Sequence, residues 1–282
     1  MEPQYLTIYD MAPGSKVGDY TIVGPNRQGG FSTAYEATDE KGERCELQFF
    51  PAGLFEEDGQ AANFRTRLTP WTEIESPAVV RVRDLVELDN AGLVLVTDYP
   101  DGASLRELLN RDKRLEPTRV ADFGRQLLAG LEKIHEKGLS HGDIKPYTIH
   151  VDEADGKDRA YLVDGGVTPG LWTAKELSGK TALIGTPYYA PMEQFGGDAP
   201  DVRSDIYNLA TVLYESITGV VPWRGKSFLE VFQAKLEEPP PMAERAAGVE
   251  VSQELEAAIR KGCQPDRHKR FDSAKEFREA LG

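Results

Sequence analysis

The sequence predicts an α+β protein with two lobes, a small strand-rich lobe followed by a larger and mainly helical lobe. Between about residues 18 and 98, short apolar runs of strand length are separated by turn residues. Beyond about residue 103, apolar residues recur every three or four positions, which is the spacing of amphipathic helices. At 282 residues, of which 40% are hydrophobic, the chain is long enough for one bilobal domain with a substantial core. A functional site is expected where the lobes meet.

The composition limits the classes of partner and the compartment. The formal net charge is −14, which argues against a general nucleic-acid surface, because binding phosphate backbones requires clustered Lys and Arg. The two cysteines, Cys45 and Cys263, are far apart and favour a reducing compartment without disulfides. The first residues resemble no signal peptide, and no apolar stretch of 18 residues occurs. We therefore expect a cytoplasmic protein with no membrane segment in this chain, no nucleic-acid partner, and a protein as partner or substrate.

The first part of the chain divides into an extension and the strand-rich lobe. Residues 1–17 are polar and punctuated by Pro and Gly, which indicates an N-terminal extension before a first strand at 20–23. Further strands are predicted at 79–82 and 93–96, and one helix is predicted near 64–75.

The second part of the chain is mostly helical. Apolar residues within 120–134 form the stripe of an amphipathic helix. A second apolar helix is predicted at 204–218, with Ser204 or Asp205 as its N-terminal cap and Gly219 at its end.

Four motifs follow one another in this second part: His141–Pro146, Val163–Gly166, Gly185–Pro187 with Glu193, and Ser204–Tyr207. In this order they resemble the catalytic loop, the metal-binding Asp-Phe-Gly turn, the end of the activation segment and the start of the central helix of protein kinases. From about residue 18 to 282 the chain is similar to bacterial Ser/Thr protein kinases of the eukaryotic type. The resemblance implies a protein-kinase-like bilobal fold. It divides into a small antiparallel β-rich N-lobe with one helix at about 18–98, a hinge at about 98–102, and a larger, mainly helical C-lobe at about 103–282.

The catalytic loop retains the residues that phosphoryl transfer needs for positioning and charge neutralisation. By resemblance, the Asp143 carboxylate would accept a hydrogen bond from the attacking hydroxyl, and Lys145 would steady the transferring phosphoryl group. Thr186 would bridge these two groups, which favours Ser/Thr over Tyr specificity. The alternative is that Asp143 and Lys145 form only a buried ion pair. Asp205 is expected to hold the backbone of the catalytic loop.

The nucleotide-binding strands depart from the family pattern. One glycine of the glycine-rich loop survives in register as Gly29, with Gly30 beside it, while Arg27 takes another glycine position, so the loop packs differently over phosphate or is a plain turn. Gln48 stands where the resemblance places the phosphate-anchoring lysine. Because side chains alternate along a strand, Glu46 is expected on the same side as Gln48, where its carboxylate would oppose adenine. A register shift or bulge that turns Glu46 to solvent is the alternative.

The helix and the hinge of the N-lobe are altered as well. Arg67 stands at the position of the glutamate that pairs with the missing lysine, so the usual ion pair is absent. Arg67 either reaches toward phosphate or lies on a solvated helix face. In the hinge, Asp98 and Pro100 are the cofactor-binding positions, but Pro100 has no amide hydrogen to donate to adenine.

The metal-binding positions are only partly retained. Asp164 remains and would hold one Mg²⁺, whereas Thr148 replaces the asparagine for the second metal and is a poorer ligand for a hard cation. Gly165 replaces the phenylalanine of the metal-binding turn. Gly142 replaces the arginine that commonly binds an activation-loop phosphate, so activation of the usual kind is not expected.

These changes favour a pseudokinase or catalytically impaired Ser/Thr kinase that acts through protein binding in signalling. The lost contacts, at about 1.5 to 3 kcal/mol for a charge-assisted one, would weaken ATP binding by roughly two to three decades. The alternative is an atypical but active ATP-dependent Ser/Thr kinase, in which Arg27 or Arg67 supplies the missing cation and ATP and Mg²⁺ are the cofactors. A third hypothesis is another nucleotide-dependent transferase on the same fold.

Overall fold

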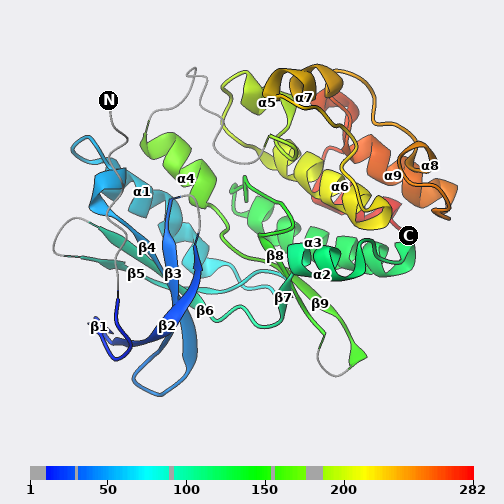
Figure 1. Cartoon of the computed structure of the whole chain (residues 1–282). Helices are drawn as coiled ribbons and strands as arrows, with labels where there is room; N and C mark the ends of the chain where they lie inside the picture. Colours follow the sequence, from blue (N-terminus) through cyan, green and yellow to red (C-terminus); the bar gives the residue numbers. More distant parts are fainter. Residues whose placement is uncertain (1–10, 29–30, 89–91, 154–155, 176–186) are drawn as a thin grey trace.

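The computed structural model describes residues 11–28, 31–88, 92–153, 156–175 and 187–282. Figure 1 shows two lobes, a small one built on a six-stranded sheet and a larger one made mainly of helices. The predicted α+β bilobal fold is therefore confirmed. Within these ranges no helix has both the length and the apolar character needed to cross a bilayer.

The small lobe is an antiparallel sheet in the order β1-β2-β3-β4-β6-β5. In that order its strands are Lys16–Val17, Tyr20–Gln28, Thr33–Thr38, Arg44–Phe50, Leu93–Asp98 and Val82–Glu87. The strands predicted at 20–23 and 93–96 are present and longer than expected. The strand predicted at 79–82 is wrong in position, because Val79 forms only an isolated parallel bridge to Leu162 and β5 begins at Val82.

The α-helix of the small lobe, α1, spans Gln60–Leu68 and continues into a 3₁₀ segment at Thr69–Glu73. The helix predicted near 64–75 therefore exists, but both of its bounds are wrong. Pro70 explains the early end, because it has no amide hydrogen to continue the α-helical hydrogen-bond pattern.

The buried face of α1 packs against both lobes. Phe64 meets Phe50 of β4 edge-on, with ring centroids 5.0 Å apart. α1 also lies next to α4 (Val167–Ala174), a helix of the large lobe that follows the turn at 163–166 (Figure 1). A β-carbon at Gly170 of α4 would lie 3.0 Å from the Phe64 ring, so the two helices approach closely.

The large lobe combines helices with a three-stranded sheet in the order β7-β8-β9. Its strands are β7 (Ala103–Ser104), β8 (Ile149–Asp152) and β9 (Arg159–Leu162). Its remaining helices are α2 (Leu105–Asp112), α3 (Pro117–Glu136), α5 (Met192–Phe195), α6 (Val202–Thr218), α7 (Phe228–Ala234), α8 (Met242–Arg245), α9 (Gln253–Gly262) and α10 (Ala274–Ala280).

The predicted helices of this lobe are present, with one cap misassigned. α3 buries the whole predicted apolar stripe. The N-cap of α6 is Asp201, whose Oδ1 accepts hydrogen bonds from two backbone amides at 2.9 Å. The prediction of Ser204 or Asp205 as the cap is wrong, because an aspartate one turn earlier already satisfies the free amides. Gly219 ends the helix with a φ of 75°, as predicted.

One hydrophobic cluster runs from the small lobe into the large one and includes Phe50, Trp71 and the buried faces of α3 and α6. Backbone hydrogen bonds also cross between the lobes. The Val80 amide donates to the Leu162 carbonyl at 2.8 Å, and the Leu162 amide donates to the Ala78 carbonyl at 2.9 Å. This contact fixes the end of β9, and the residues that follow it, against both lobes.

Candidate functional site

An arginine bridges the two lobes at the centre of the candidate site. Arg27, near the end of β2, contacts both Glu46 of β4 and Asp164, which follows β9. To Asp164, the Nη1–Oδ2 and Nη2–Oδ1 distances are both 2.5 Å. To Glu46, the Nε–Oε2 distance is 2.9 Å and the Nη2–Oε1 distance is 2.5 Å. Each carboxylate is thus held by at least two charge-assisted hydrogen bonds, which are stronger than neutral ones.

The charge state of this cluster follows from its partial burial. The Glu46 side chain is 3% exposed and that of Arg27 is 27% exposed. Burial alone would raise the pKa of the Asp164 carboxyl group, but the adjacent Arg27 guanidinium outweighs it and lowers that pKa. Burial likewise disfavours the Arg27 cation, whereas Asp164 and then Glu46 raise its pKa well above the usual value. The Arg27 cation and the Asp164 carboxylate therefore favour each other's charged forms.

Glu46 lies on the same face of β4 as Gln48, as the alternation of side chains along a strand predicts. β4 pairs with β3 and β6 without a register shift, so Glu46 and Gln48 share a face. Besides the bonds from Arg27, Glu46 accepts a hydrogen bond from Asn26 Nδ2 at 2.6 Å. The alternative of a bulge that turns Glu46 to solvent is wrong, because the strand is regular and the side chain is buried.

Of the small-lobe positions expected near phosphate, Gln48 contacts a neighbouring side chain and Arg67 faces solvent. Gln48 is buried, and its Nε2 donates to Ser32 Oγ at 2.8 Å. Arg67 of α1 is exposed, and among the described residues it has no hydrogen-bond or ion-pair partner. A solvated helix face is therefore the better of its two interpretations. Gly29 and Gly30 lie outside the described residues.

The hinge directs its side chains to several different partners. Pro100 is buried, and Asp98 at the end of β6 accepts a hydrogen bond from Arg83 Nε at 2.5 Å. Between them, the Tyr99 ring is covered by the Arg44 guanidinium, 3.8 Å from the ring centroid. The Tyr99 hydroxyl also lies 3.5 Å from the side-chain oxygen of Asn26, so the hinge reaches the same strand as Arg27.

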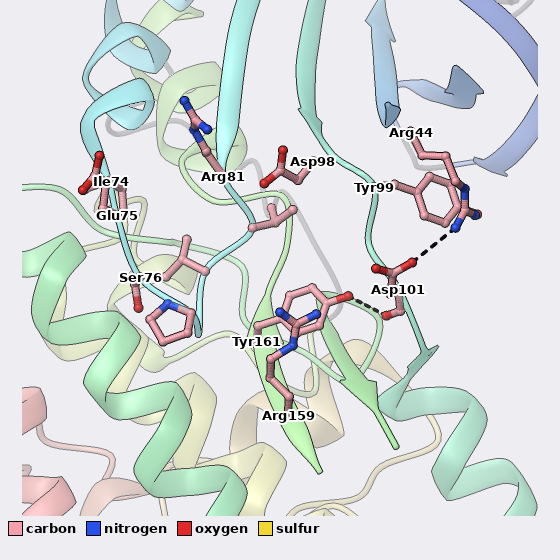
Figure 2. A pocket seen from close by; sticks show the side chains of 13 residues that line it. Arg44, Ile74, Glu75, Ser76, Arg81, Asp98, Tyr99, Asp101, Arg159 and Tyr161 are labelled. Carbon is pink, nitrogen blue, oxygen red and sulfur yellow. Dashed lines mark hydrogen bonds and ion pairs between the residues drawn. The ribbon is translucent and has the colours of Figure 1, made fainter. Parts of the chain in front are cut away.

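An open pocket of about 620 Å³ borders this hinge, and Figure 2 shows its lining. Asp101 lies at one side, where its carboxylate accepts from Arg44 at 3.3 Å and its carbonyl accepts from the Tyr161 hydroxyl at 2.5 Å. The pocket shares no lining residue with the Arg27, Glu46 and Asp164 cluster. It is therefore a separate feature of the hinge.

The catalytic-loop residues are close together. Lys145 Nζ lies 2.5 Å from Asp143 Oδ2, and both side chains are partly exposed. The Thr148 hydroxyl donates to the Asp143 carbonyl at 2.8 Å and accepts from the Lys145 amide at 3.0 Å, so it closes the loop. Thr186 lies outside the described residues. Those residues contain no group of three or more His, Cys, Asp or Glu side chains that could hold a metal ion.

Asp205 of α6 holds the backbone of this loop, as expected. Its Oδ2 accepts from the His141 amide at 2.8 Å, and its Oδ1 accepts from the Gly142 amide at 2.7 Å. His135 of α3 lies 2.9 Å from the same carboxylate. Since Asp205 is fully buried, these contacts fix the loop from inside the large lobe.

Two of the altered glycines are explained by bulky neighbours. A β-carbon at Gly165 would lie 2.1 Å from Cζ3 of Trp71, which is buried in the 3₁₀ segment after α1. Trp71 thus fills the space beside the turn at 163–166, which is predicted to bind metal. At Gly142, where φ is 81°, a β-carbon would lie 2.3 Å from Cγ of Pro169.

Sequence reasoning missed the roles of Trp71, Asn26 and His150. The His150 ring on β8 is half-buried, and its buried Nδ1 has no hydrogen-bond partner among the described residues. Burial lowers the pKa of His150, and Arg27 lowers it further, which places the ring near the charged cluster. The sequence did contain a signal for His150, because it is a polar residue between the aliphatic Ile149 and Val151 shortly after the catalytic loop.

The comparisons with known proteins agree with this arrangement. The protein kinase domain family matches residues 23–280. The chain belongs to the protein kinase family. The match lies within the predicted domain at 18–282, although the exact domain boundaries stay a prediction.

Curated relatives place the chain among bacterial Ser/Thr kinases of the eukaryotic type, as the motifs predict. It is 30% identical over 258 residues to Mycobacterium leprae serine/threonine-protein kinase PknB, covering 90% of this chain and 41% of that protein. It is 32% identical over 265 residues to Mycobacterium tuberculosis PknD, covering 93% of this chain and 39% of that protein. The chain thus spans about two fifths of the length of these relatives.

The fold is confirmed by solved structures. The kinase domain of Mycobacterium tuberculosis PknI superposes with a TM-score of 0.75 at 20% sequence identity, covering 96% of this chain and 98% of that one. The kinase-like arrangement of a β-rich N-lobe and a helical C-lobe is therefore that of this chain.

Proposed function

We propose that this chain is a pseudokinase, a kinase-fold module that acts through protein binding in signalling and not through phosphoryl transfer. The observation that carries the proposal is the Arg27 guanidinium, which lies on Asp164, the predicted metal ligand. The same guanidinium holds Glu46, which lies on the strand face expected to meet adenine. Arg27 therefore takes the place at which a metal ion and nucleotide phosphates would have to bind.

The charge balance supports the proposal. Arg27 with its two carboxylates carries one excess negative charge, and Asp143 with Lys145 is neutral, so no positive charge remains for a triphosphate among these five groups. A Mg²⁺ ion would first have to displace a guanidinium tethered to the chain. Losing two charge-assisted hydrogen bonds at about 1.5 to 3 kcal/mol each corresponds to roughly two to four decades in binding.

Three further positions also weaken the expected binding of nucleotide and magnesium. Gln48 uses its amide on Ser32 and carries no charge for a phosphate. Pro100 offers adenine no backbone donor. The Thr148 hydroxyl is engaged by the backbone of its own loop. The residues present therefore fit a nucleotide with magnesium poorly, and no transfer step is derived through them.

An atypical active kinase is the second candidate, and one observation favours it. The Asp143–Lys145 pair and the Asp205 contacts keep the catalytic loop in an ordered arrangement that phosphoryl transfer would use. In that case ATP and Mg²⁺ are the cofactors, and Arg27 would have to turn from Asp164 to the phosphates.

A transfer assay separates the two candidates. The chain is incubated with labelled ATP and Mg²⁺ or Mn²⁺, and calorimetric titration with ATP up to millimolar concentration follows binding. The expected results are no label on the protein above an Asp143→Asn control and no heat of binding. Robust autophosphorylation that Asp143→Asn abolishes would overturn the proposal and establish the active kinase.

We also infer that the partner is a protein and that the chain is cytoplasmic. The partner class rests on relatives named as serine/threonine-protein kinases and on the negative net charge. The compartment rests on Cys45 and Cys263, which are both buried free thiols. Cell fractionation of the tagged full-length protein tests the location.

A further inference from the structure

A second pocket, of about 340 Å³, lies between the C-terminal ends of α2 and α6. α2 contributes Arg106 and Asn110, and Lys113 and Arg114 follow directly after it. α6 contributes Glu215. None of these residues belongs to the Arg27, Glu46 and Asp164 cluster, so the pocket is separate from the nucleotide site.

The pocket is cationic in a protein whose net charge is −14. Its lining includes three cationic side chains, those of Arg106, Lys113 and Arg114, and one carboxylate, that of Glu215. This carboxylate is already occupied, because it accepts from Arg106 Nη2 at 3.0 Å and from the Tyr189 hydroxyl at 2.6 Å. Lys113 and Arg114 are exposed and form no ion pair with any described residue, and Lys113 Nζ donates only to the Asn110 carbonyl at 2.8 Å. Two cations thus remain without a counter-charge.

The backbone at this pocket is strained. Lys113 has a φ of 68° and Asp164 one of 62°, and in the described part of the chain no other residue apart from glycine has a positive φ. Asp164 belongs to the kinase site, and such strain is typical of functional positions. The Lys113 carbonyl also lies 2.8 Å from where a β-carbon of Gly219 would stand, so α6 approaches this turn closely. A glycine would relieve the strain at position 113, but it would remove a cation from the pocket.

We propose that this pocket binds an anionic segment of a partner protein, with acidic or phosphorylated side chains held by Lys113 and Arg114. Charge-assisted bonds to carboxylate or phosphate oxygens are the contacts that these side chains form best. A local pocket with two free cations suits one or two anionic side chains. An extended polyanion such as a nucleic acid would meet the repulsion of the remaining negative protein. Binding here is independent of whether the nucleotide site transfers phosphate.

The pocket also connects to the end of the activation segment. An anion that reaches Arg106 competes with Glu215 for the Arg106 guanidinium. Glu215 also accepts a hydrogen bond from Tyr189, which lies two residues after the predicted activation-segment motif Gly185–Pro187. The Arg106 guanidinium also lies 5.7 Å from the ring centroid of Tyr147. A partner bound at this pocket therefore lies close to Tyr189 and to Tyr147, which follows the catalytic loop.

The test uses two fluorescein-labelled peptides with the intact chain, a hexaglutamate and a version with one phosphoserine, and measures fluorescence anisotropy at low and physiological salt. Binding of an anionic peptide is expected, weaker at higher salt, with no binding of a hexaglutamine control. Arg114→Gln and Lys113→Gly should each weaken binding roughly fivefold, while Lys275→Gln, at an exposed lysine elsewhere, leaves it unchanged. Lys113→Gly should at the same time raise the melting temperature, because it relieves the positive φ.

Each outcome supports or overturns the proposal. Binding of only the phosphoserine peptide identifies phosphorylated segments as the ligand, whereas binding of hexaglutamate identifies acidic ones. Equal affinity of wild type and both pocket variants would place the ligand elsewhere and overturn the proposal. The proposal also fails if wild type binds neither peptide, or if it binds a single-stranded oligonucleotide more tightly than both.

Discussion

Arg27 and Asp164 are 137 residues apart in the chain, and two parallel hydrogen bonds of 2.5 Å join the guanidinium of one to the carboxylate of the other. Arg27 belongs to the sheet of the small lobe, and Asp164 follows β9 of the large lobe. Nη2 of the same guanidinium also lies 2.5 Å from Glu46, so one nitrogen separates two carboxylate oxygens. Arg27 thus places a cation, tethered to the chain, against the predicted metal ligand Asp164.

Removing this cation should convert the cluster into a metal site. In Arg27→Gln, Glu46 and Asp164 lose their counter-charge, and the free energy of unfolding should fall by about 2 to 3 kcal/mol, less than for a fully buried pair because Arg27 is partly exposed. Millimolar Mn²⁺ should then raise the melting temperature of the variant but not that of wild type. Arg44→Gln is the matched control, since Arg44 also contacts two carboxylates but neither is Asp164. An Arg27→Gln protein indifferent to Mn²⁺ would contradict this interpretation.

The effects of substitutions at Trp71 and Gly165 on stability should be coupled, because the Trp71 ring occupies the space beside Gly165. Gly165→Ala brings its methyl group onto the Trp71 ring and should destabilise the fold by roughly 1 to 3 kcal/mol. Trp71→Ala should cost about 3 to 5 kcal/mol, because a buried indole leaves a cavity. The double variant should be more stable than the sum of the two losses predicts. Urea unfolding followed by circular dichroism measures this double-mutant cycle, and strict additivity would exclude the coupling.

The fold and the large-lobe part of the site follow from local sequence. The resemblance to protein kinases implied the role of Asp205, and strand alternation predicted the side on which Glu46 lies, so both could be predicted. The contact between Arg27 and Asp164 could not, because it depends on how the lobes meet over 137 residues. Sequence also misplaced the strand at 79–82, where an apolar run that reads as a sheet strand instead packs against β9. The apolar pattern at 79–82 thus indicated burial, but neither the position of the strand nor the segment that these residues pack against.

The role of Asp205 in holding the catalytic loop should be separable from its role in α6. Asp205→Asn places an amide group against the His141 and Gly142 backbone donors and should cost about 3 kcal/mol or more, since one buried donor is left without an acceptor. Asp201→Asn on the same helix is the control. Asparagine is as good an N-cap as aspartate, so stability should change little. Similar losses from both variants in urea unfolding would mean that Asp205 acts only on the helix.

Lys235 should make the stability of the large lobe depend on pH. Its side chain is fully buried, and Nζ donates to the Tyr188 and Ala190 carbonyls at 2.8 and 2.9 Å. Burial lowers the pKa of Lys235 to about 7, from an ordinary value near 10.5 in the unfolded chain. Between these values the unfolded state binds more protons than the folded state, so stability rises with pH. The contribution approaches about 1.4 kcal/mol per pH unit once Lys235 is neutral in the fold.

Urea unfolding between pH 7 and 8.5 measures this slope. The upper limit matters because burial also raises the pKa of Cys45 to about 11 and that of Cys263 to about 12. Above about pH 9 the unfolded thiols lose protons that the folded ones keep, so the two cysteines lower stability and mask the lysine. Lys235→Met should remove most of the slope below that limit, whereas Lys261→Met, at an exposed lysine, should leave it intact. A slope that persists in Lys235→Met would assign the pH dependence to another group.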